Sequence, residues 1–326
     1  MGNQGNRGFV LGFDVGGTRL KSGAVARSGK LLAEGIVPSG AHRGPRALLA
    51  ALVGEARRLS RRAGGTPRAI GIGLPGAVDP KRGIVLLPGR LKGLEGFSLV
   101  PRLARATGLP VVADNDGRLS IVAESRYGLA RGRKWALSIT LGTGVGSGVM
   151  LDGKILRDPH LQFGTQASHI VMQADGGRLC LTGARGTAEM LCSATALAMA
   201  VRDGLQRGIP SLLADRYVAD PASINFEAVV EGVARKDRLC LDELGLWTER
   251  LGWFLVSAIH AYAPEVVILS GGATNGARHF LKPLREHVNR HLFRYPPVEA
   301  VPIVLSKMRD HAGVLGAGAV AWEAAC

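Results

Sequence analysis

Near its N-terminus the chain reads Phe9-Val10-Leu11-Gly12-Phe13-Asp14-Val15-Gly16-Gly17-Thr18-Arg19-Leu20-Lys21. The apolar start predicts a strand, and the two adjacent glycines allow a sharp turn that brings backbone N–H groups close to an anion. The hydroxyl of Thr18 and the ammonium of Lys21 can bind phosphate oxygens, and Asp14 can hold a metal ion or its water. The segment therefore predicts a phosphate-binding hairpin, although an ordinary hairpin turn would use glycine for its geometry alone.

A second segment repeats this pattern about one domain further along the chain. Apolar residues 136–140 and 149–151 predict two more strands. Between them the sequence reads Leu141-Gly142-Thr143-Gly144-Val145-Gly146-Ser147-Gly148. A Gly-Lys turn then closes both copies, at 29–30 and at 153–154. A single long-period repeat is typical of two similar domains rather than of a solenoid, so a nucleotide could be bound from both sides.

Length and composition are those of an ordinary globular protein. The chain has 326 residues, of which 46% are hydrophobic and 46 are glycine, enough for two domains with a core each. No apolar run approaches the roughly 18 to 20 residues of a membrane span, and residues 1–7 are polar, which favours a cytoplasmic protein. The four cysteines lack the spacing of a disulfide framework and are expected to be reduced thiols.

The formal net charge of +15 raises the question of nucleic-acid binding. Only nine of the 41 basic residues are lysine, and the arginines are scattered over expected helix faces, as at 57–62, without the interleaved aromatic residues of a stacking surface. We therefore expect neither a nucleic-acid nor a membrane partner. A positive field would still favour anionic ligands such as ATP and sugar phosphates.

Strands and helices alternate along the chain, which predicts an α/β architecture. The expected strands are 70–74, 83–87, 110–113, 265–269 and 301–305, and the expected helices are 45–64, 99–107, 242–263, 279–293 and 312–325.

The strand at 110–113 leads into Asp114-Asn115-Asp116-Gly117. A hydroxyl must lose its proton as it attacks the terminal phosphate of a nucleotide, and a carboxylate within hydrogen-bond reach can accept it. We choose Asp116 for this role, with Asn115 beside it offering a donor and an acceptor to neighbouring hydroxyls. The alternative is a plain turn, because each of these residue types favours turns.

Five motifs in this order resemble the ROK family of sugar kinases and regulators. They are Asp14-Val15-Gly16-Gly17-Thr18 with Lys21, Gly71-Ile72-Gly73-Leu74-Pro75-Gly76, Asp114-Asn115-Asp116-Gly117, Gly142-Thr143-Gly144-Val145-Gly146 and Ser270-Gly271-Gly272. The closing segment, Asp310-His311-Ala312-Gly313-Val314-Leu315-Gly316-Ala317, is also similar. The resemblance implies the actin-like, hexokinase-like (ribonuclease H-like) α/β fold, in which two domains close around a cleft. The N-terminal domain would comprise 1–117, completed by the helix 312–326, and the C-terminal domain would comprise 118–311.

The resemblance also implies roles for individual residues, with Asp116 as the general base. The sugar would be bound by Gly76, Asn115, Asp116, Gln166, His169 and Glu189. The phosphates of ATP would be bound by Asp14, Gly16, Gly17, Thr18, Lys21, Thr140, Gly142, Thr143, Gly144 and Gly146. Gly271 and Gly272 would border the adenosine, and Mg²⁺ would bridge the phosphates.

The chain departs from the family where its members bind a structural zinc through one histidine and three cysteines. The matching histidine, His169, and the first cysteine, Cys180, remain, but Thr182 and Thr187 replace the other two ligands. Threonine is a poor zinc ligand, so we expect no zinc site and expect the two hydroxyls to bond backbone groups instead. A rearranged site that uses Cys192 is the alternative.

These residues together predict ATP-dependent phosphorylation of a hexose or amino sugar, with glucose as the default acceptor and N-acetylmannosamine next. Gln166 replaces a family glutamate. Its amide offers one hydrogen-bond acceptor and one donor, whereas a carboxylate accepts from two hydroxyls, so the identity of the sugar that receives the phosphate stays open. The alternative is a sugar or nucleotide sensor with the same fold and little turnover. A DNA-binding regulator is not expected, because only about eight residues precede the first strand. The resemblance suggests a homodimer or homotetramer, and GTP or polyphosphate remain alternative donors.

Overall fold

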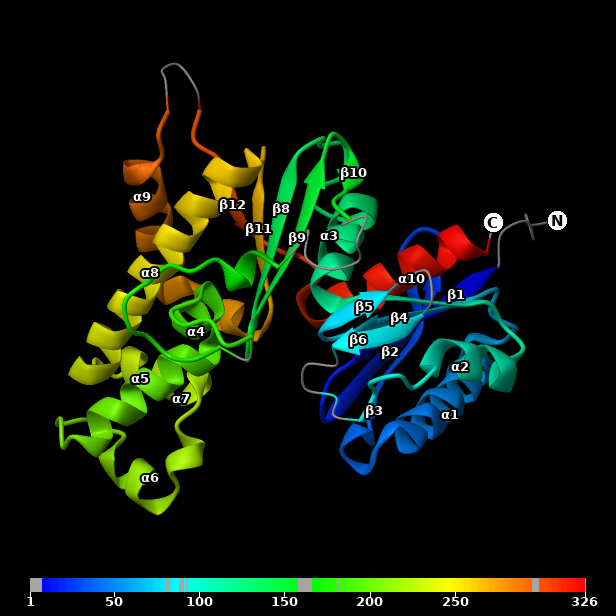
Figure 1. The fold of residues 1–326 in the computed structure, drawn as a ribbon, viewed down its shortest axis with the longest axis horizontal. Coiled ribbons are helices and arrows are strands. Elements are labelled where there is room, and N and C mark those ends of the chain that lie inside the picture. The colour runs from blue at the N-terminus through cyan, green and yellow to red at the C-terminus, as the bar shows by residue number, and fades with distance from the viewer. Residues whose placement is uncertain are drawn as a thin grey trace. The chain divides into compact units, whose positions relative to one another are not determined.

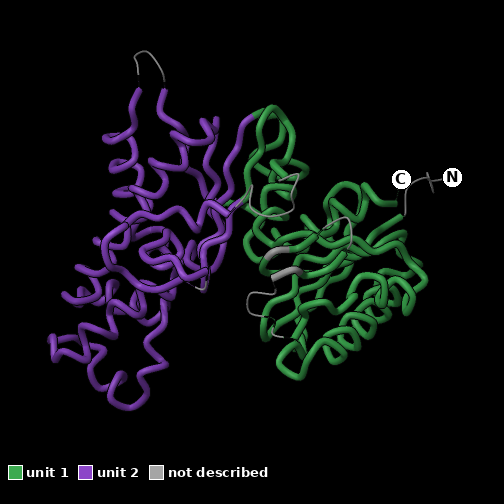
Figure 2. Tube along the Cα trace, in the orientation of Figure 1, with its two compact units in different colours: residues 1–134, 148–165, 306–326 green, residues 135–147, 166–305 purple. Residues whose placement is uncertain are grey.

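The computed structural model describes residues 8–79, 83–87, 91, 93–157, 166–180, 182–294 and 299–325. The chain divides into two compact units (Figure 2). Unit 1 comprises 1–134, 148–165 and 306–326, and unit 2 comprises 135–147 and 166–305. The contacts thus place residues 118–134 in unit 1, beyond the expected domain boundary at residue 117.

Unit 1 is built on a five-stranded sheet in the order β3-β2-β1-β4-β7. Its strands are β1 (Phe9–Val15), β2 (Arg19–Ala26), β3 (Leu31–Pro38), β4 (Ile70–Leu74) and β7 (Val111–Asn115). The first three are antiparallel neighbours, whereas β1, β4 and β7 run parallel. Helices α1 (Pro45–Ala63) and α2 (Leu99–Thr107) cover one face of the sheet, and α3 (Asp116–Tyr127) and α10 (Ala312–Ala324) cover the other (Figure 1). A small hairpin, β5 (Ala77–Asp79) and β6 (Ile84–Leu87), completes the unit.

Strand β1 is buried on both faces. Phe9, Leu11 and Phe13 belong to the core cluster that includes residues of α1 and α2. Val10, which points to the opposite face, packs with residues of α10. Successive side chains of a strand alternate between faces, so covering both faces requires the continuous apolar run seen in the sequence.

Helix α10 approaches the sheet so closely that two strand positions have no room for a side chain. A Cβ on Gly12 of β1 would fall on the backbone carbonyl oxygen of Val314, and one on Gly71 of β4 would fall on that of Ala317. Because backbone oxygens cannot swing aside as side chains do, glycine at these positions determines how deeply α10 sits on the sheet.

We expect Gly71→Ala to destabilise the protein by about 2 to 3 kcal/mol, because α10 must move away from the sheet to admit the methyl group. The midpoint of urea unfolding, followed by circular dichroism, measures the change. Gly54→Ala is the matched control: an added Cβ at this α1 position meets no other atom within 4 Å. Alanine there should raise stability by about 0.5 to 1 kcal/mol. Equal midpoints for the two variants would contradict this account of α10.

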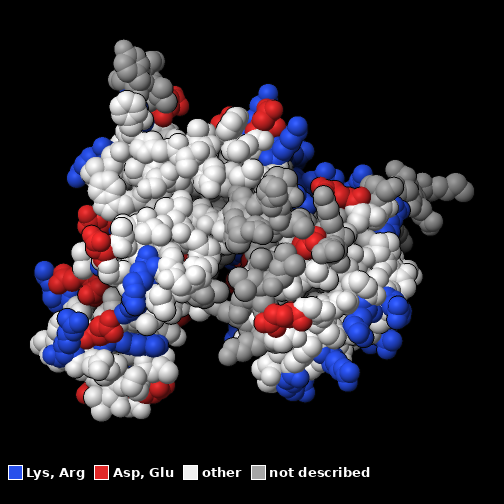
Figure 3. All heavy atoms as spheres, in the orientation of Figure 1, with Lys and Arg blue, Asp and Glu red and all other residues white. Residues whose placement is uncertain are grey.

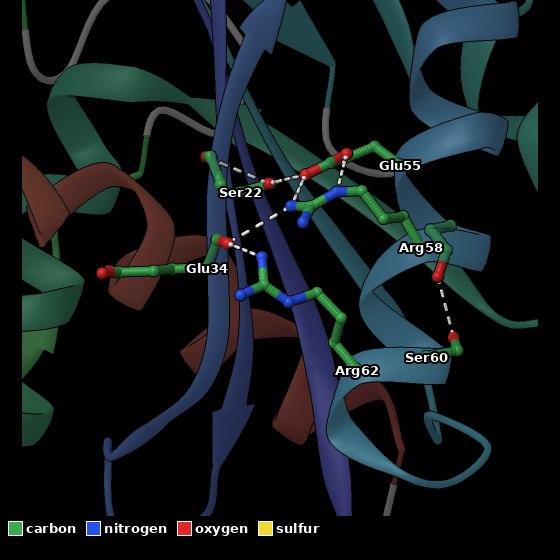
Figure 4. A network of polar contacts seen from close by, with 8 residues as sticks. Ser22, Glu34, Glu55, Arg58, Ser60 and Arg62 are labelled. Atoms are coloured by element: carbon green, nitrogen blue, oxygen red, sulfur yellow. Dashed lines mark hydrogen bonds and ion pairs between the residues drawn. The ribbon is translucent and has the colours of Figure 1, made fainter.

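A buried carboxylate joins α1 to β2 inside unit 1 (Figure 4). The Glu55 side chain, 3% exposed, accepts hydrogen bonds from Ser22 Oγ at 2.5 Å and from Arg58 Nη2 and Nε at 2.5 and 2.7 Å. Arg58 Nη2 also donates to the carbonyl oxygen of Glu34 in β3, at 3.2 Å. Glycine at position 35 leaves space for the guanidinium, because a Cβ on Gly35 would fall on Arg58 Nη2. The network therefore ties α1 to both β2 and β3.

The second five-stranded sheet has the order β10-β9-β8-β11-β12. Its strands are β8 (Ala136–Leu141), β9 (Val145–Leu151), β10 (Lys154–Ile155), β11 (Val267–Ser270) and β12 (Ile303–Leu305). Strands β8, β11 and β12 are parallel, and β9 and β10 are antiparallel. When the strands of each sheet are numbered in chain order, both sheets have the order 3-2-1-4-5. This shared order confirms the duplication expected from the two glycine segments.

The helices of unit 2 pack around α8 (Arg238–Tyr262), which contacts four of the others. Helix α8 packs against α4 (Ala188–Cys192), α5 (Ala194–Gln206), α7 (Phe226–Ala234) and α9 (Leu281–His291). The remaining helix, α6 (Ala214–Ala219), has no extensive contact with α8. Trp247 of α8 is buried, and its Nε1–H donates to the carbonyl oxygen of Ser193 at 3.0 Å. Short 3₁₀ segments complete the described chain: Ala41–Arg43, Ala167–His169, Pro221–Ser223, Gly272–His279 and Arg309–His311. Within the described ranges, no helix combines the length and apolar character needed to cross a membrane.

Candidate active site

The carboxyl ends of three parallel strands in unit 1 carry the first group of predicted residues. Asp14 of β1 is paired in register with Gly73 of β4, and Gly73 with Asp114 of β7. Asp14 also lies opposite Lys21 of β2. Ligands of open α/β sheets bind beyond this edge of the strands. The register therefore brings the glycine hairpin and the segment that begins at Asp114 to one edge of the sheet.

The hairpin between β1 and β2 turns at residues 16–18 and is held through its carbonyl groups. Gly16 N–H donates to the carbonyl oxygen of Arg19 at 2.8 Å. Ser39, which is fully buried, donates its Oγ–H to the carbonyl oxygen of Gly17 at 2.9 Å and its N–H to that of Thr18 at 3.0 Å. Ser39 thus fixes the position of the turn, and the side chain of Thr18 stays exposed.

Asp14 sits in an unfavourable place for a negative charge. Burial raises the pKa of its carboxyl group above the usual value, while the charge of Lys21 lowers it and that of Asp310 raises it further. Lys21 Nζ is itself 3.1 Å from Asp310 Oδ1. The backbone of α10 adjoins the carboxyl group, since a Cβ on Gly313 would lie 2.6 Å from Asp14 Cγ. A carboxylate whose charge burial disfavours gains from a nearby cation, which fits the expected metal or metal-water role.

Asn115 and Asp116 lie where β7 passes into α3. Asn115 is the N-cap of the helix: its Oδ1 accepts the N–H of Arg118 at 3.2 Å, and its Nδ2 donates to the carbonyl oxygen of Gly76 at 2.8 Å. Asp116 is the first residue of α3 and is exposed, with Oδ1 accepting the N–H of Gly117 at 2.8 Å. The carboxylate chosen as the base therefore lies at the surface beside an amide that is fixed in place. The sugar contacts of Asn115 and Gly76 stay predictions.

Two guanidinium groups hold the carboxylate of Asp114, which precedes Asn115 and Asp116 in the chain. Asp114 is 1% exposed, and its Oδ1 accepts from Arg118 Nε at 2.6 Å and lies 2.5 Å from Arg118 Nη2. Its Oδ2 lies 3.2 Å from Arg157 Nη2. The N–H of Asn115 also donates to Asp114 Oδ1 at 2.7 Å. The carboxyl end of β7 is thus anchored from α3 and from the segment after β10.

The second glycine loop, 142–144 in unit 2, is held by the start of α5. Gly142 N–H donates to the carbonyl oxygen of Gly144 at 2.9 Å, and its own carbonyl oxygen accepts the N–H of Ala194 at 2.9 Å. Thr195 Oγ1 donates to the carbonyl oxygen of Thr143 at 2.7 Å. In both loops one glycine N–H donates within the loop, and the contacts to the rest of the chain are accepted by loop carbonyl groups.

Glu189 and the segment 166–169 lie next to this second loop. Glu189 Oε2 accepts the N–H of Val145 at 3.1 Å, and the N–H of Ala167 donates to Ser147 Oγ at 3.0 Å. Both contacts are made to β9 directly after the glycine loop. The structure therefore brings predicted phosphate-binding and predicted sugar-binding segments together within unit 2.

The loop that replaces a zinc knuckle keeps one close pair of side chains. Cys180, 3% exposed, has its Sγ 3.4 Å from His169 Nδ1. Cys192 is fully buried on α4, and burial raises the pKa of its thiol. Across the described parts of the chain, no three side chains of His, Cys, Asp or Glu are grouped to hold a metal ion. Two ligands are too few for a tetrahedral structural zinc.

We expect protein purified without chelators to contain no stoichiometric zinc, because threonine stands at two ligand positions of the family motif. Metal analysis by inductively coupled plasma mass spectrometry measures the content. A value near one zinc per chain would contradict this prediction, and loss of that zinc from a Cys180→Ala variant would locate the metal.

Thr187 differs from the sequence-based expectation. Its hydroxyl is fully buried and has no hydrogen-bond partner among the described residues, so the expected bond to a backbone group is wrong for this side chain. The backbone of Thr187 forms an antiparallel bridge with Val171, and its side chain is buried. The same expectation for Thr182 stays a prediction.

Gly271 follows β11 and packs against the end of β8. It has a φ of 90°, and a Cβ there would fall on the carbonyl oxygen of Leu141. Immediately before it, Ser270 Oγ lies 3.0 Å from Thr140 Oγ1. Thr274 Oγ1 donates to the carbonyl oxygen of Gly271 at 2.7 Å. The fold itself therefore requires glycine at position 271.

Three other predicted glycines are not required by the fold. Gly17, Gly142 and Gly272 do not have a positive φ, and a Cβ at any of them would meet no other atom within 4 Å. Gly76 differs, with a φ of 89°. Open space beside the backbone at all three positions is what a phosphate or nucleoside needs to come close to main-chain N–H groups.

Comparison with known proteins places the chain in a family. The ROK family profile matches residues 10–324. The chain belongs to the ROK family. A glucokinase of Thermotoga maritima is 29% identical over 317 residues, which are 96% of this chain and 97% of that protein.

Solved structures confirm the fold of this ROK protein. A ROK hexokinase from Thermus thermophilus has a TM-score of 0.80 at 29% identity, over 97% of this chain and 98% of that one. A ROK family glucokinase from Streptomyces griseus, in complex with glucose and AMPPNP, has a TM-score of 0.82 at 26% identity, over 97% and 100%. The expected actin-like, hexokinase-like class is thus correct.

The residues of this ROK protein fit a magnesium-bound nucleotide phosphate. Burial raises the pKa of Asp14, so its carboxylate would gain from a hydrated cation, and Lys21 adds a positive charge beside it. In unit 1, backbone with open space at Gly17 could approach phosphate oxygens. Oxygen ligands are what Mg²⁺ prefers, usually with several waters retained.

Several residues that position the site were missed from the sequence. Ser39 fixes the first loop, Asp310 pairs with Lys21, and Arg157 contacts Asp114. Each acts on a residue far away in sequence, so no spacing pattern could reveal it. Asp310 lies in the closing segment of the family resemblance, which was the one available signal.

Proposed function

We propose that this ROK protein is an ATP-dependent kinase that phosphorylates a hydroxyl of a hexose or amino sugar, with glucose as the first acceptor to test. The observation that carries the proposal is the register of the unit 1 sheet. It pairs Asp14 of the hairpin with Gly73, and Gly73 with Asp114, two residues before Asp116. Membership of the ROK family supports the proposal, as does similarity to a protein named glucokinase.

In the proposed reaction, Asp116 accepts the proton of the sugar hydroxyl as the hydroxyl oxygen attacks the terminal phosphorus of ATP. A bond forms between the sugar oxygen and that phosphorus, and the bond from the phosphorus to the bridging oxygen breaks, which leaves ADP. Lys21 and those N–H groups of the two glycine loops that do not donate within their own loop would bind phosphate oxygens. Mg²⁺ held by Asp14, directly or through water, would neutralise charge on the phosphates.

Besides Gly76, Asn115 and Asp116, the proposed sugar contacts include residues of unit 2. Gln166, His169 and Glu189 are the proposed contacts, and Glu189 already bonds the backbone after the second glycine loop. The amide of Gln166 can both donate and accept a hydrogen bond, whereas a carboxylate only accepts. This favours a sugar whose hydroxyl or N-acetyl groups differ from those of the sugar that a glutamate at this position would bind.

ADP release with Mg²⁺ and ATP, measured across a panel of hexoses and amino sugars, tests the proposal. We expect at least one sugar to stimulate ADP release well above the rate of Asp116→Asn. A panel in which glucose, mannose and N-acetylmannosamine all fail to do so would overturn the kinase proposal and favour a sensor of the same fold.

Gly17→Ala and Gly142→Ala should each raise KM for ATP by about tenfold or more, since a methyl group would occupy the space that phosphate oxygens approach. Their unfolding midpoints should stay close to that of the native protein, because nothing in the described structure contacts an added Cβ. Gly245→Ala on α8 has equally open space and is the matched control, with unchanged KM. An unaltered KM in both loop variants would contradict phosphate binding at these turns.

A further inference from the structure

Unit 1 contains a cavity of about 520 Å³ among α3, the β9–β10 hairpin and α10. Val122 of α3, Met150 of β9 and Ala319 of α10 form a buried apolar floor. Nothing in the proposed reaction uses this cavity. Its size is that of a site for a small organic molecule.

The rim of the cavity is strongly basic. Arg126, Arg133, Lys154 and Arg157 line it, and Glu323 is the acidic residue among the described lining residues. Of the four cations, Arg157 is the one with an ion pair to a described carboxylate. Figure 3 shows basic side chains at the tip of the β9–β10 hairpin, with an acidic side chain among them. Arg126, Arg133 and Lys154 thus leave the rim with a net positive charge over the apolar floor, because Glu323 is the one acidic side chain among the described lining residues.

We propose that this cavity binds a small phosphate ester, with the phosphate on the basic rim and the organic part on the apolar floor. Arginine matches phosphate particularly well, because its planar guanidinium can bond two oxygens at once. An ester is favoured over inorganic phosphate, because the floor formed by Val122, Met150 and Ala319 offers apolar surface to bury.

Arg157 connects this cavity to the segment that carries Asp116. It lines the cavity with a side chain that is 42% exposed, and its Nη2 lies 3.2 Å from Asp114 Oδ2. That oxygen is buried and has no hydrogen-bond partner among the described residues, so Arg157 is the cation that compensates it. A phosphate in the cavity competes with Asp114 for Arg157. Binding therefore loosens the end of β7. If Asp116 has its proposed role, this loosening also changes the rate of turnover.

Titration with phenyl phosphate, by isothermal calorimetry and without ATP or sugar, tests the binding site. We expect binding that weakens at raised salt and that is about tenfold or more weaker in the double variant Arg133→Glu, Lys154→Glu. The matched control Arg61→Glu, Arg105→Glu makes the same change of net charge at exposed helix positions of unit 1 and should bind as the native protein does. Absence of binding to the native protein, or equal affinities of the two double variants, would overturn the proposal. Arg133→Gln with Lys154→Gln replaces the charge-reversal variant if the latter fails to fold.

Hydrogen exchange of the backbone at 111–118 tests the connection through Arg157. Phenyl phosphate should speed exchange there in the native protein, and the Arg157→Gln variant should already exchange faster without the ligand and respond little to it. Exchange that phenyl phosphate leaves unchanged in the native protein would overturn the connection. Neither measurement uses the kinase reaction, so failure here is distinct from failure of the proposed function.

Discussion

Asp116→Asn is expected to lower kcat for sugar phosphorylation by about 10³-fold, because an amide cannot accept the proton of the attacking hydroxyl. The fold should be unaffected: Asp116 is exposed at the start of α3, and an asparagine Oδ1 can accept the N–H of Gly117 just as the carboxylate does. The rate of sugar-dependent ADP formation measures the loss, with unfolding midpoints as a check of stability.

Asp215→Asn provides the matched control for this variant. Asp215 is also an exposed aspartate in the first turn of a helix, α6, and removing its charge changes the net charge equally. Its kcat should equal that of the native protein. If Asp116→Asn kept more than about a tenth of the native kcat, Asp116 would not be the base, since loss of a general base has a larger effect.

Arg58→Met is expected to destabilise unit 1 by about 3 to 5 kcal/mol at pH 7, because it leaves the Glu55 carboxylate buried without its cation. Burial by itself would raise the pKa of Glu55, but hydrogen bonds from Arg58 and Ser22 and the charges of Arg58 and Arg62 outweigh it and hold the pKa below the usual 4.5. The native network therefore contributes stability above pH 4.5 that is lost as pH falls through the lowered pKa. Urea unfolding at several pH values measures these effects.

Removing the cation reverses the sign of this pH dependence. In Arg58→Met, only the hydrogen bond from Ser22 and the charge of Arg62 still oppose burial, so we expect the pKa of Glu55 to rise above its usual value. The variant then loses stability as pH rises through that pKa, and its deficit narrows in acid. Adding Glu55→Gln to Arg58→Met should restore much of the stability at pH 7. Arg61→Met on the exposed side of α1 is the control and should change stability by less than about 0.5 kcal/mol. A deficit for Arg58→Met that does not depend on pH would contradict the role of a buried carboxylate.

Local patterns predicted much of the fold. The glycine turn after the apolar strand at Phe9 and its repeat at Gly142 predicted the two hairpins, and the repeat predicted two similar domains, which the matching strand orders confirm. Alternation of apolar segments gave β4, β7, α1, α2 and α8 within a few residues. Helix α6 was missed because it buries no residue, so it carries no apolar periodicity that a sequence could show.

Contacts between distant segments could not be predicted in the same way. Arg58 stands three residues after Glu55 on the expected helix 45–64, a spacing at which charged side chains meet, but nothing near Glu55 in the sequence indicates that Ser22 would bond it. The burial of the Thr187 hydroxyl likewise depends on residues that the local sequence does not reveal. Glycine was recognised as important in both loops, but only the surrounding atoms separate Gly271, which the fold requires, from Gly17, which it does not. Sequence patterns therefore identified candidate chemistry, and packing showed which residues hold it in place.

Transfer of labelled phosphate from [γ-³²P]ATP to glucose or N-acetylmannosamine tests the central claim most directly. We predict a labelled sugar phosphate formed in equal amount to ADP by the native protein, and none above background with Asp116→Asn. ADP formation without a labelled sugar phosphate, or equal transfer by the two proteins, would contradict the claim that Asp116 activates a sugar hydroxyl for attack on ATP.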